Sequence, residues 1–262
     1  MIKKVVDKKE HFYYQVPKSF VVNDYREADN SVSNNLLLVY CAIDKWKNTK
    51  NQYRGTLLGL VKDCGIPLAS DRNLSHMVKK IIITMEFMED NKMFSVIEGD
   101  YRNVTEMFVL QVNILNFTNK KSYVLLDDIY LDYILNLKCS IKKSNLLQIL
   151  LYVLSPKIEH KIVNKETGEI IKVYFQVFSE STHHIAKKLG ISDGTIKKAL
   201  SFLSDVKSEN GKPLIVRQHK GYVKNGKYHK FPNIYTENSL GWEKRIMAEF
   251  KYYDKQVEKR LD

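Results

Sequence analysis

Residues 180–203, ESTHHIAKKLGISDGTIKKALSFL, carry the strongest fold signal in the chain. Two helices are expected within this stretch, with a turn at Gly190, because glycine tolerates the left-handed backbone conformation that ends many helices. Ser192 can cap the second helix by accepting a hydrogen bond from one of its first free N–H groups. Ala186 is small where the two helices must cross closely. The stretch therefore predicts a compact pair of helices.

The second helix of the pair is amphipathic. Helical spacing directs four apolar side chains toward a core: Ile196, Ala199, Leu200 and Leu203. The opposite face is small, polar and basic, and its amino-terminal half carries Ser192, Gly194, Thr195, Lys197 and Lys198. A helix with such a face can enter the major groove of DNA, which is about 12 Å wide. These five residues are therefore candidates for DNA contact.

The run LGISDGTIKKAL at 189–200 resembles the helix-turn-helix of winged-helix DNA-binding proteins. In that class a β-hairpin, the wing, follows the second helix. The alternative interpretation is a helical hairpin in some other α/β domain.

Residues 211–230, GKPLIVRQHKGYVKNGKYHK, fit the expected wing. Asn225-Gly226 is a tight-turn signal at its tip, and Tyr222 and Tyr228 lie between the charges. The segment contains no acid and has six cations: Lys212, Arg217, Lys220, Lys224, Lys227 and Lys230. Cations on a projecting hairpin can follow the DNA phosphates or enter the minor groove. The alternative interpretation is a solvated loop.

The first half carries a weaker copy of the helix pair. The run SDRNLSHMV at 70–78 aligns with SDGTIKKAL at 192–200. The expected exposed residues are Arg72, Asn73, Ser75, His76, Lys79 and Lys80. Arg and Asn are the side chains that pair with guanine and adenine by two hydrogen bonds. We favour DNA contact by this helix.

The hairpin expected after that first helix pair, residues 91–114, is acidic. Its charges are Lys92 and Arg102 against Glu98, Asp100 and Glu106. Such a wing is a poor phosphate binder. The first module therefore either reads bases through its helix alone or contacts protein.

Internal matches indicate a duplication. Asn35-Leu36-Leu37 corresponds to Asn145-Leu146-Leu147, Gly65-Ile66 to Gly190-Ile191, and Asn113-Ile114 to Asn233-Ile234. In each half we expect a strand, three helices and a hairpin. The expected segments are 12–17, 33–46, 56–64, 70–88, 93–97 and 106–115, then 122–126, 143–154, 181–189, 193–203, 214–218 and 221–236. An extra hairpin around the turn ETGE, 166–169, explains why the spacing differs between halves.

The sequence thus predicts an α+β protein of two tandem winged-helix domains, 1–120 and 121–239. A carboxy-terminal helix over 240–262 follows, used for packing or self-association.

Composition agrees with a folded protein that has a polyanionic partner. The 262 residues are 44% hydrophobic and 27% charged, with a formal net charge of +12. A membrane span needs about 18 apolar residues, and no apolar run in the sequence approaches that length. The amino-terminal residues lack the pattern of a secretory signal. Cys41, Cys64 and Cys139 form no C-x-x-C pair, which favours buried thiols over a disulfide or zinc site. We expect a cytoplasmic protein with no membrane association.

Enzyme signatures are missing. The chain has no G-x-x-x-x-G-K-[ST] loop and no His-x-His pair, and His183-His184 point in different directions on a helix. No tyrosine has the histidine–arginine setting of a nucleophile. We expect no catalytic residue, no metal and no cofactor.

The opening run FYYQVPKSF at 12–20 is similar to the start of the RepA-like replication initiators of Gram-positive theta-replicating plasmids. The resemblance implies binding of double-stranded DNA at repeated origin sites and recruitment of host replication proteins. A homodimer is compatible with it. Three alternatives stay open: a transcription regulator, a primosome-type replisome adaptor and a nickase.

Overall fold

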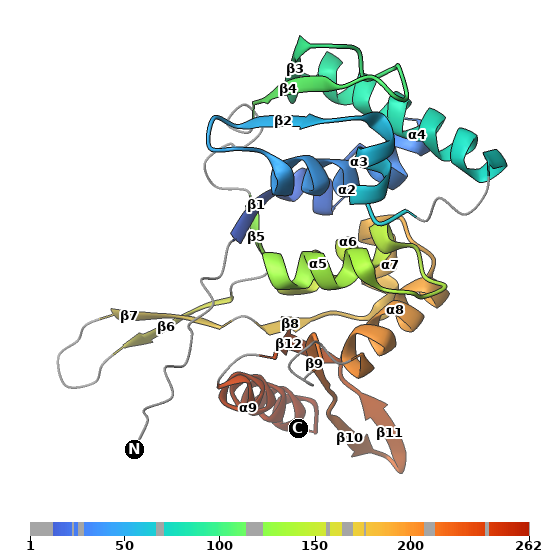
Figure 1. The fold of residues 1–262 in the computed structure, drawn as a ribbon. Helices are drawn as coiled ribbons and strands as arrows, with labels where there is room; N and C mark the ends of the chain where they lie inside the picture. The colour runs from blue at the N-terminus through green and yellow to red at the C-terminus, as the bar shows by residue number, and fades with distance from the viewer. Residues whose placement is uncertain are drawn as a thin grey trace, which may run out of the picture. The chain divides into compact units, whose positions relative to one another are not determined.

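A computed structural model describes residues 13–22, 24, 25, 29–66, 71–113, 123–155, 158–163, 170–175, 177–206, 213–238 and 241–261 (Figure 1). At 30, 71–74, 158–163, 170–175, 260 and 261 it describes the backbone alone. The chain mixes helices and strands, in agreement with the expected α+β class. Its described residues form two compact units. The first falls within Met1–Pro17 and Asn35–Lys138, and the second within Lys18–Asn34 and Cys139–Asp262.

The first unit contains a three-stranded antiparallel sheet in the order β2-β4-β3. Buried aromatic rings of Tyr53, Tyr101 and Phe108 pack around β4, with the Tyr53 and Phe108 centroids 5.9 Å apart. A separate antiparallel pair joins β1 to β5. The elements are β1 (Tyr13–Pro17), most of α2 (Asn30–Trp46), β2 (Gln52–Gly55), α3 (Leu57–Asp63), α4 (Asp71–Asp90), β3 (Phe94–Glu98), β4 (Phe108–Val112), β5 (Tyr123–Asp127) and α5 (Asp128–Asn136).

The second unit contains the corresponding sheet, in the order β8-β12-β9. Two further antiparallel hairpins, β6–β7 and β10–β11, belong to it. Its elements are α1 (Lys18–Val21), the start of α2, α6 (Lys143–Leu154), β6 (Ile158–Val163), β7 (Ile170–Phe175), β8 (Val177–Ser179), α7 (Thr182–Leu189), α8 (Asp193–Asp205), β9 (Ile215–Gln218), β10 (Gly221–Lys224), β11 (Lys227–Lys230), β12 (Ile234–Glu237) and α9 (Trp242–Leu261).

The second sheet has a helix on each face. On one face Phe178 and Tyr235 pair across β8 and β12, and Phe178 packs edge-to-face on Tyr152 of α6 with centroids 5.2 Å apart. On the other face Val216 and Ile234 join a core with buried residues of α9. Because strand side chains alternate between faces, each strand residue of this sheet can be assigned to the α6 side or the α9 side.

The two units share an order of elements. In each, a strand of the three-stranded sheet is followed by two helices and the other two strands of that sheet, of which the last lies in the middle; in the second unit β10 and β11 come between those two strands. This order agrees with the internal sequence matches. The hairpin β6–β7 lies between α6 and α7, as the difference in spacing predicts, and its expected turn at 166–169 lies outside the described residues.

The division of the chain differs from the expected boundary at residue 120. Residues 123–138, which carry β5 and α5, belong to the first unit, because β5 pairs along its length with β1. The first unit also lacks residues 18–34, which group with the second unit. One contact that holds them there is the hydrogen bond from the Gln148 side-chain amide to the Val21 carbonyl, at 3.0 Å.

Candidate nucleic-acid interface

The α7–α8 pair is closed by the caps that its sequence predicts. The Ser192 hydroxyl accepts a hydrogen bond from the Thr195 N–H at 3.3 Å, which begins α8. Ser181 caps α7 in the same way by accepting from the His184 N–H at 3.2 Å. Gly190 ends α7 with a φ of 68°, in the left-handed region where glycine is favoured. The turn between the helices therefore depends on these local interactions.

Helix α8 has one buried face and one face open to solvent. Its four expected core residues, Ile196, Ala199, Leu200 and Leu203, are fully buried. Ser192, Gly194, Lys197 and Lys198 are exposed, and Thr195 is half-buried with its hydroxyl 2.9 Å from that of Ser192. Within the described part of the chain, no carboxylate forms an ion pair with either lysine. The five sequence-predicted residues thus share one accessible cationic surface.

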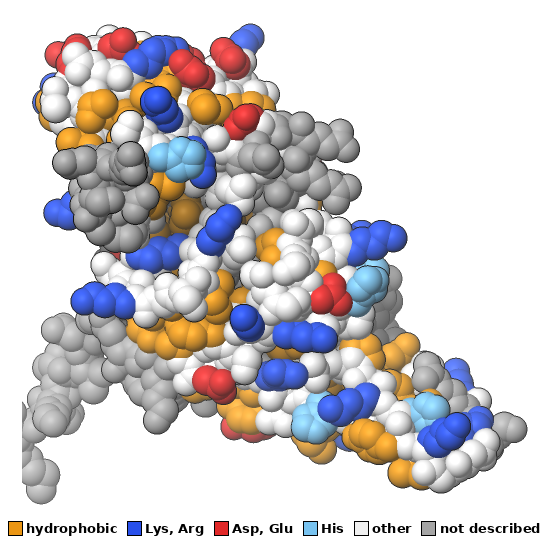
Figure 2. Space-filling model, turned by 90° about the vertical axis from the view of Figure 1, so that its right-hand side faces the viewer, with side chains coloured by type: hydrophobic (Ala, Val, Ile, Leu, Met, Phe, Trp, Pro, Cys, Tyr) orange, Lys and Arg blue, Asp and Glu red, His pale blue; other side chains and the backbone are white. Residues whose placement is uncertain are grey.

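The β10–β11 hairpin lies where the sequence predicts a wing. Asn225 and Gly226 both have positive φ, 51° and 72°, as a two-residue type I′ turn requires. Lys227 and Lys230 of the hairpin are exposed and Lys224 is half-buried, and Arg217, also among the expected cations, is exposed on β9. Lys212 lies outside the described residues. In Figure 2, Lys, Arg and His side chains gather over the second unit, and acidic ones are sparse there.

Lys220 corrects the expectation that every cation of the wing faces DNA. Its ammonium pairs with the Asp254 carboxylate on α9. The same nitrogen lies 3.5 Å from the Phe250 carbonyl and 5.3 Å from the centre of the Phe250 ring. An acid of the protein itself thus pairs with this charge, because the connection between β9 and β10 brings Lys220 to α9. No local sequence pattern signals this ion pair, because Asp254 is 34 residues away.

Helix α9 packs under the base of the wing. Phe231, just after β11, stacks on Tyr253 with ring centroids 4.2 Å apart and 16° between planes. Tyr222 of β10 packs on Phe231 and stacks on His229. The Tyr253 hydroxyl contacts Ser179 Oγ and lies 3.3 Å from the Pro232 carbonyl. The carboxy-terminal helix is therefore a packing element of the second unit.

Helix α4 carries the candidate DNA-contact residues of the first half of the chain. Ser75, His76 and Lys79 are exposed, and Lys80 is half-buried. Arg72 and Asn73 lie in the helix by their backbone, and their side chains lie outside the described residues, as does position 70 that would cap the helix.

Acids engage the arginine of the first hairpin and one arginine of strand β2. Arg102 lies 3.0 Å from Glu86, 3.5 Å from Glu89 and 3.5 Å from Asp100, and hydrogen bonding to Glu86 raises its pKa above the ordinary value. Arg54 pairs with Glu98 at 3.6 Å. These pairings agree with the expectation that this wing is a poor phosphate binder.

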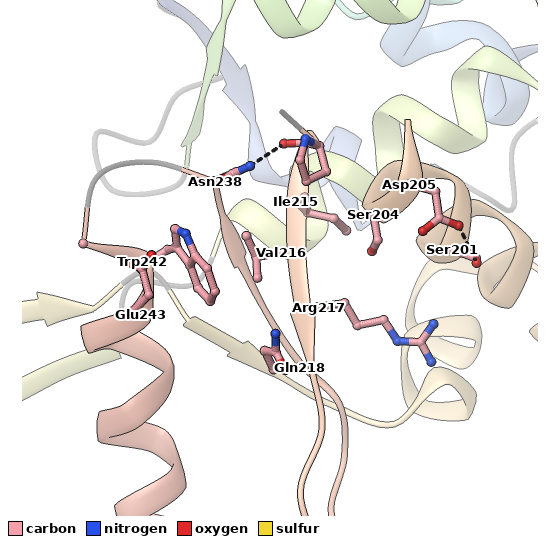
Figure 3. Close-up of a pocket in the computed structure, with 12 residues that line it drawn as sticks. Ser201, Ser204, Asp205, Ile215, Val216, Arg217, Gln218, Asn238, Trp242 and Glu243 are labelled. Carbon is pink, nitrogen blue, oxygen red and sulfur yellow. Dashed lines mark hydrogen bonds between the residues drawn. The ribbon is translucent and has the colours of Figure 1, made fainter. Parts of the chain in front are cut away.

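A cleft that the sequence did not indicate lies along β9 (Figure 3). Its volume is about 730 Å³, and it is lined by the end of α8, by β9 and by the start of α9. Figure 3 shows the Arg217 side chain directed toward α8, from which Ser201 and Asp205 project, while Trp242 lies on the α9 side. Ser201 donates a hydrogen bond to Asp205 at 3.3 Å. Arg217 therefore extends the cationic face of α8.

Other candidate chemistry is sparse in the described part of the chain. No group of three or more metal-ligating side chains occurs there. His183 and His184 are exposed and lie near Asp193 and Glu180, at 3.3 Å and 3.6 Å. Cys41 and Cys64 are buried as expected, whereas Cys139 is half-buried, with its thiol 3.3 Å from the Ile141 carbonyl.

None of the described helices has the length and apolar character needed to cross a bilayer. No protein-family model, curated protein or solved structure matches this chain.

Proposed function

We propose that this chain is a sequence-specific double-stranded DNA-binding protein whose two units are winged-helix modules. One observation carries the proposal. The lysines of α8 are exposed, and Arg217 of β9 is directed toward that helix, in the unit that also carries the cationic hairpin. This is the surface that a helix entering a major groove and a wing following the adjacent backbone would need.

Base reading is assigned to the amino-terminal half of α8. Thr195, Lys197 and Lys198 are the polar side chains that project from it, and Gly194 allows the backbone to approach the groove floor. Each well-formed contact to a base edge gives about 1–3 kcal/mol of discrimination. Asp193 at the helix start is turned aside by its contact with His183.

The wing supplies phosphate contacts. Arg217, Lys224, Lys227 and Lys230 are its described cations apart from Lys220, which is held by Asp254. Phosphate contacts set the register and orientation of a protein on the duplex and make the affinity dependent on salt. In the first module, Ser75, His76, Lys79 and Lys80 on α4 form a second, weaker reading surface together with Arg72 and Asn73.

The biological role that we favour is replication initiation at a plasmid or mobile-element origin, with no catalytic activity of the chain itself. Tandem modules suit repeated origin sites, since each can occupy one part of an extended site. The likeness of residues 12–20 to plasmid initiators supports the same role, with host replication proteins as further partners. A transcription regulator would use the same DNA chemistry.

The acidic first hairpin favours a second candidate, a replisome adaptor. Arg102 of this hairpin and Arg54 of β2 pair with carboxylates, so this surface suits protein better than phosphate. An adaptor would use the modules for assembly and would bind duplex DNA without sequence preference.

Selection of duplexes from a random pool, followed by footprinting, tests the proposal. We expect an enriched site and protection of a major-groove stretch that is lost in the Thr195→Ala, Lys197→Ala double variant. Lys259→Ala, on an exposed position of α9, is the matched control and should retain the site. Binding without any enriched sequence would contradict the proposal and favour the adaptor.

A further inference from the structure

Two large apolar side chains face solvent near the tip of the cationic hairpin. Val223 of β10 and Tyr228 of β11 lie directly opposite each other in the strand register. Their exposed fractions are 62% and 60%. Apolar area of this kind costs free energy in water, about 25 cal/mol per Å², so a covering surface would stabilise it.

This pair lies on the hairpin face that α9 leaves open. Tyr222 packs toward α9 through Phe231, and Lys220 reaches Asp254. Since side chains alternate along a strand, Val223 projects to the opposite face of this two-stranded hairpin. The apolar pair therefore lies on the hairpin face that α9 does not cover.

The backbone is shaped to hold the tyrosine ring in place. A Cβ at Gly221 would clash with the Tyr228 hydroxyl, so glycine at this position lets the ring lie across β10. The hairpin base is held by the Phe231–Tyr253 stack. The pair is thus presented on a supported hairpin.

The surroundings of the pair are cationic. Lys230, opposite Gly221, shares the open face with the apolar pair, and Lys224 and Lys227 form the cross-strand pair at the tip, on the other face by the same alternation. No acid occurs between residues 211 and 230. A covering surface must combine apolar edges with dense negative charge, and the minor groove of duplex DNA has both, with base edges between two phosphate rows.

We propose that Val223 and Tyr228 form an apolar wedge that enters the minor groove and partly unstacks a base step, while the neighbouring lysines bind the phosphates. The inference rests on the proposed DNA-binding function and goes beyond it, because it assigns to the wing a deformation of the duplex. Pyrimidine–purine steps such as TA unstack most easily, so the wedge favours AT-rich duplexes.

The test uses the full chain and a 30-base-pair AT-rich duplex carrying 2-aminopurine at a central TA step, with a GC-rich duplex of equal length for comparison. Saturating wild-type protein should raise the 2-aminopurine fluorescence, since the probe brightens when unstacked. The Val223→Thr, Tyr228→Thr double variant keeps two residues suited to strands. It should bind the AT-rich duplex about tenfold more weakly and leave the fluorescence at the level of free DNA.

A charge variant of the same hairpin is the matched control. Lys227→Gln, Lys230→Gln should weaken binding to both duplexes and still give the full fluorescence rise at saturation. Wild-type binding without a fluorescence rise, or a double apolar variant that binds and brightens like wild type, would overturn the wedge while leaving duplex binding intact. A wild-type protein that binds neither duplex at low salt would overturn both the wedge and the proposed function.

Discussion

Phe231 and Tyr253 stack nearly parallel, with centroids 4.2 Å apart, across the junction between the wing and helix α9. Both residues are buried, and Tyr253 also belongs to the core that α9 shares with the sheet. The stack joins the end of the hairpin to a helix that begins about ten residues later. The direction in which the wing projects is therefore tied to the packing of α9.

Replacing Tyr253 by Ala should lower the free energy of unfolding by about 3–5 kcal/mol, because a buried aromatic ring is lost from a shared core. Thermal or urea unfolding measures the change. The adjacent Tyr252 is 51% exposed, so Tyr252→Ala serves as control and should change stability by less than about 0.5 kcal/mol. Equal losses in the two variants would contradict the packing role of α9.

The cations of the wing should differ in their effect on salt dependence. Lys230→Gln should make the slope of log affinity against log salt shallower by about 0.9, the value for one lost phosphate contact. Lys220→Gln should leave the slope nearly unchanged, since Asp254 already neutralises that charge. Titrations at several salt concentrations check this. A Lys220 variant with the shallower slope would show that its ion pair opens on DNA.

Lys197→Ala or Thr195→Ala should lower specific affinity by about 1–3 kcal/mol if each contacts a base edge. Affinity for random DNA should fall less, because base contacts carry the sequence preference. Competition between the selected site and random duplex measures the ratio. If that ratio is unchanged in both variants, α8 does not read the bases.

Two glycines of the helix pair should respond oppositely to alanine. Gly190 has a φ of 68°, so Gly190→Ala should destabilise the protein by about 1 kcal/mol. Gly194 lies in the first turn of α8, and nothing lies within 4 Å of an added Cβ. Gly194→Ala should stabilise the protein by about 0.5–1 kcal/mol. If this more stable variant loses DNA affinity, the backbone at Gly194 lies close to the DNA in the complex.

Stability should fall in alkali partly through Tyr152. Burial, the Glu180 charge and a 3.3 Å hydrogen bond to that carboxylate raise the pKa of Tyr152 from 10.0 to about 12. The folded state therefore holds this proton more tightly than the unfolded state, so its contribution is complete below pH 10 and is lost between about pH 10 and 12. Between about pH 10 and 12, the free energy of unfolding should fall less steeply with pH in Tyr152→Phe than in wild type. Denaturant unfolding at several pH values measures this. Parallel curves for variant and wild type would contradict the assignment.

Local chemistry made the α7–α8 pair predictable. Its caps, its left-handed glycine and the apolar spacing of α8 act within a few residues of one another, so the sequence contains the whole cause. The Asn225-Gly226 turn is predictable for the same reason. The short strands β2 and β8 were not anticipated, because strands of three or four residues carry too little periodicity to be recognised. Helix α5 was not anticipated either.

Long-range pairing decided the rest. The pairing of β1 with β5 places residues 123–127 in the first unit, although they are more than 100 residues from their partner strand. The ion pair between Lys220 and Asp254 removes one cation from the wing, and the strand register brings Val223 opposite Tyr228 on an open face. A sequence lists charges and apolar residues in order, but which face each occupies, and which charge meets its opposite, depends on strand pairing and on where α9 packs. The α7–α8 pair could thus be located from sequence, whereas the surface that the β10–β11 hairpin presents depends on the tertiary structure.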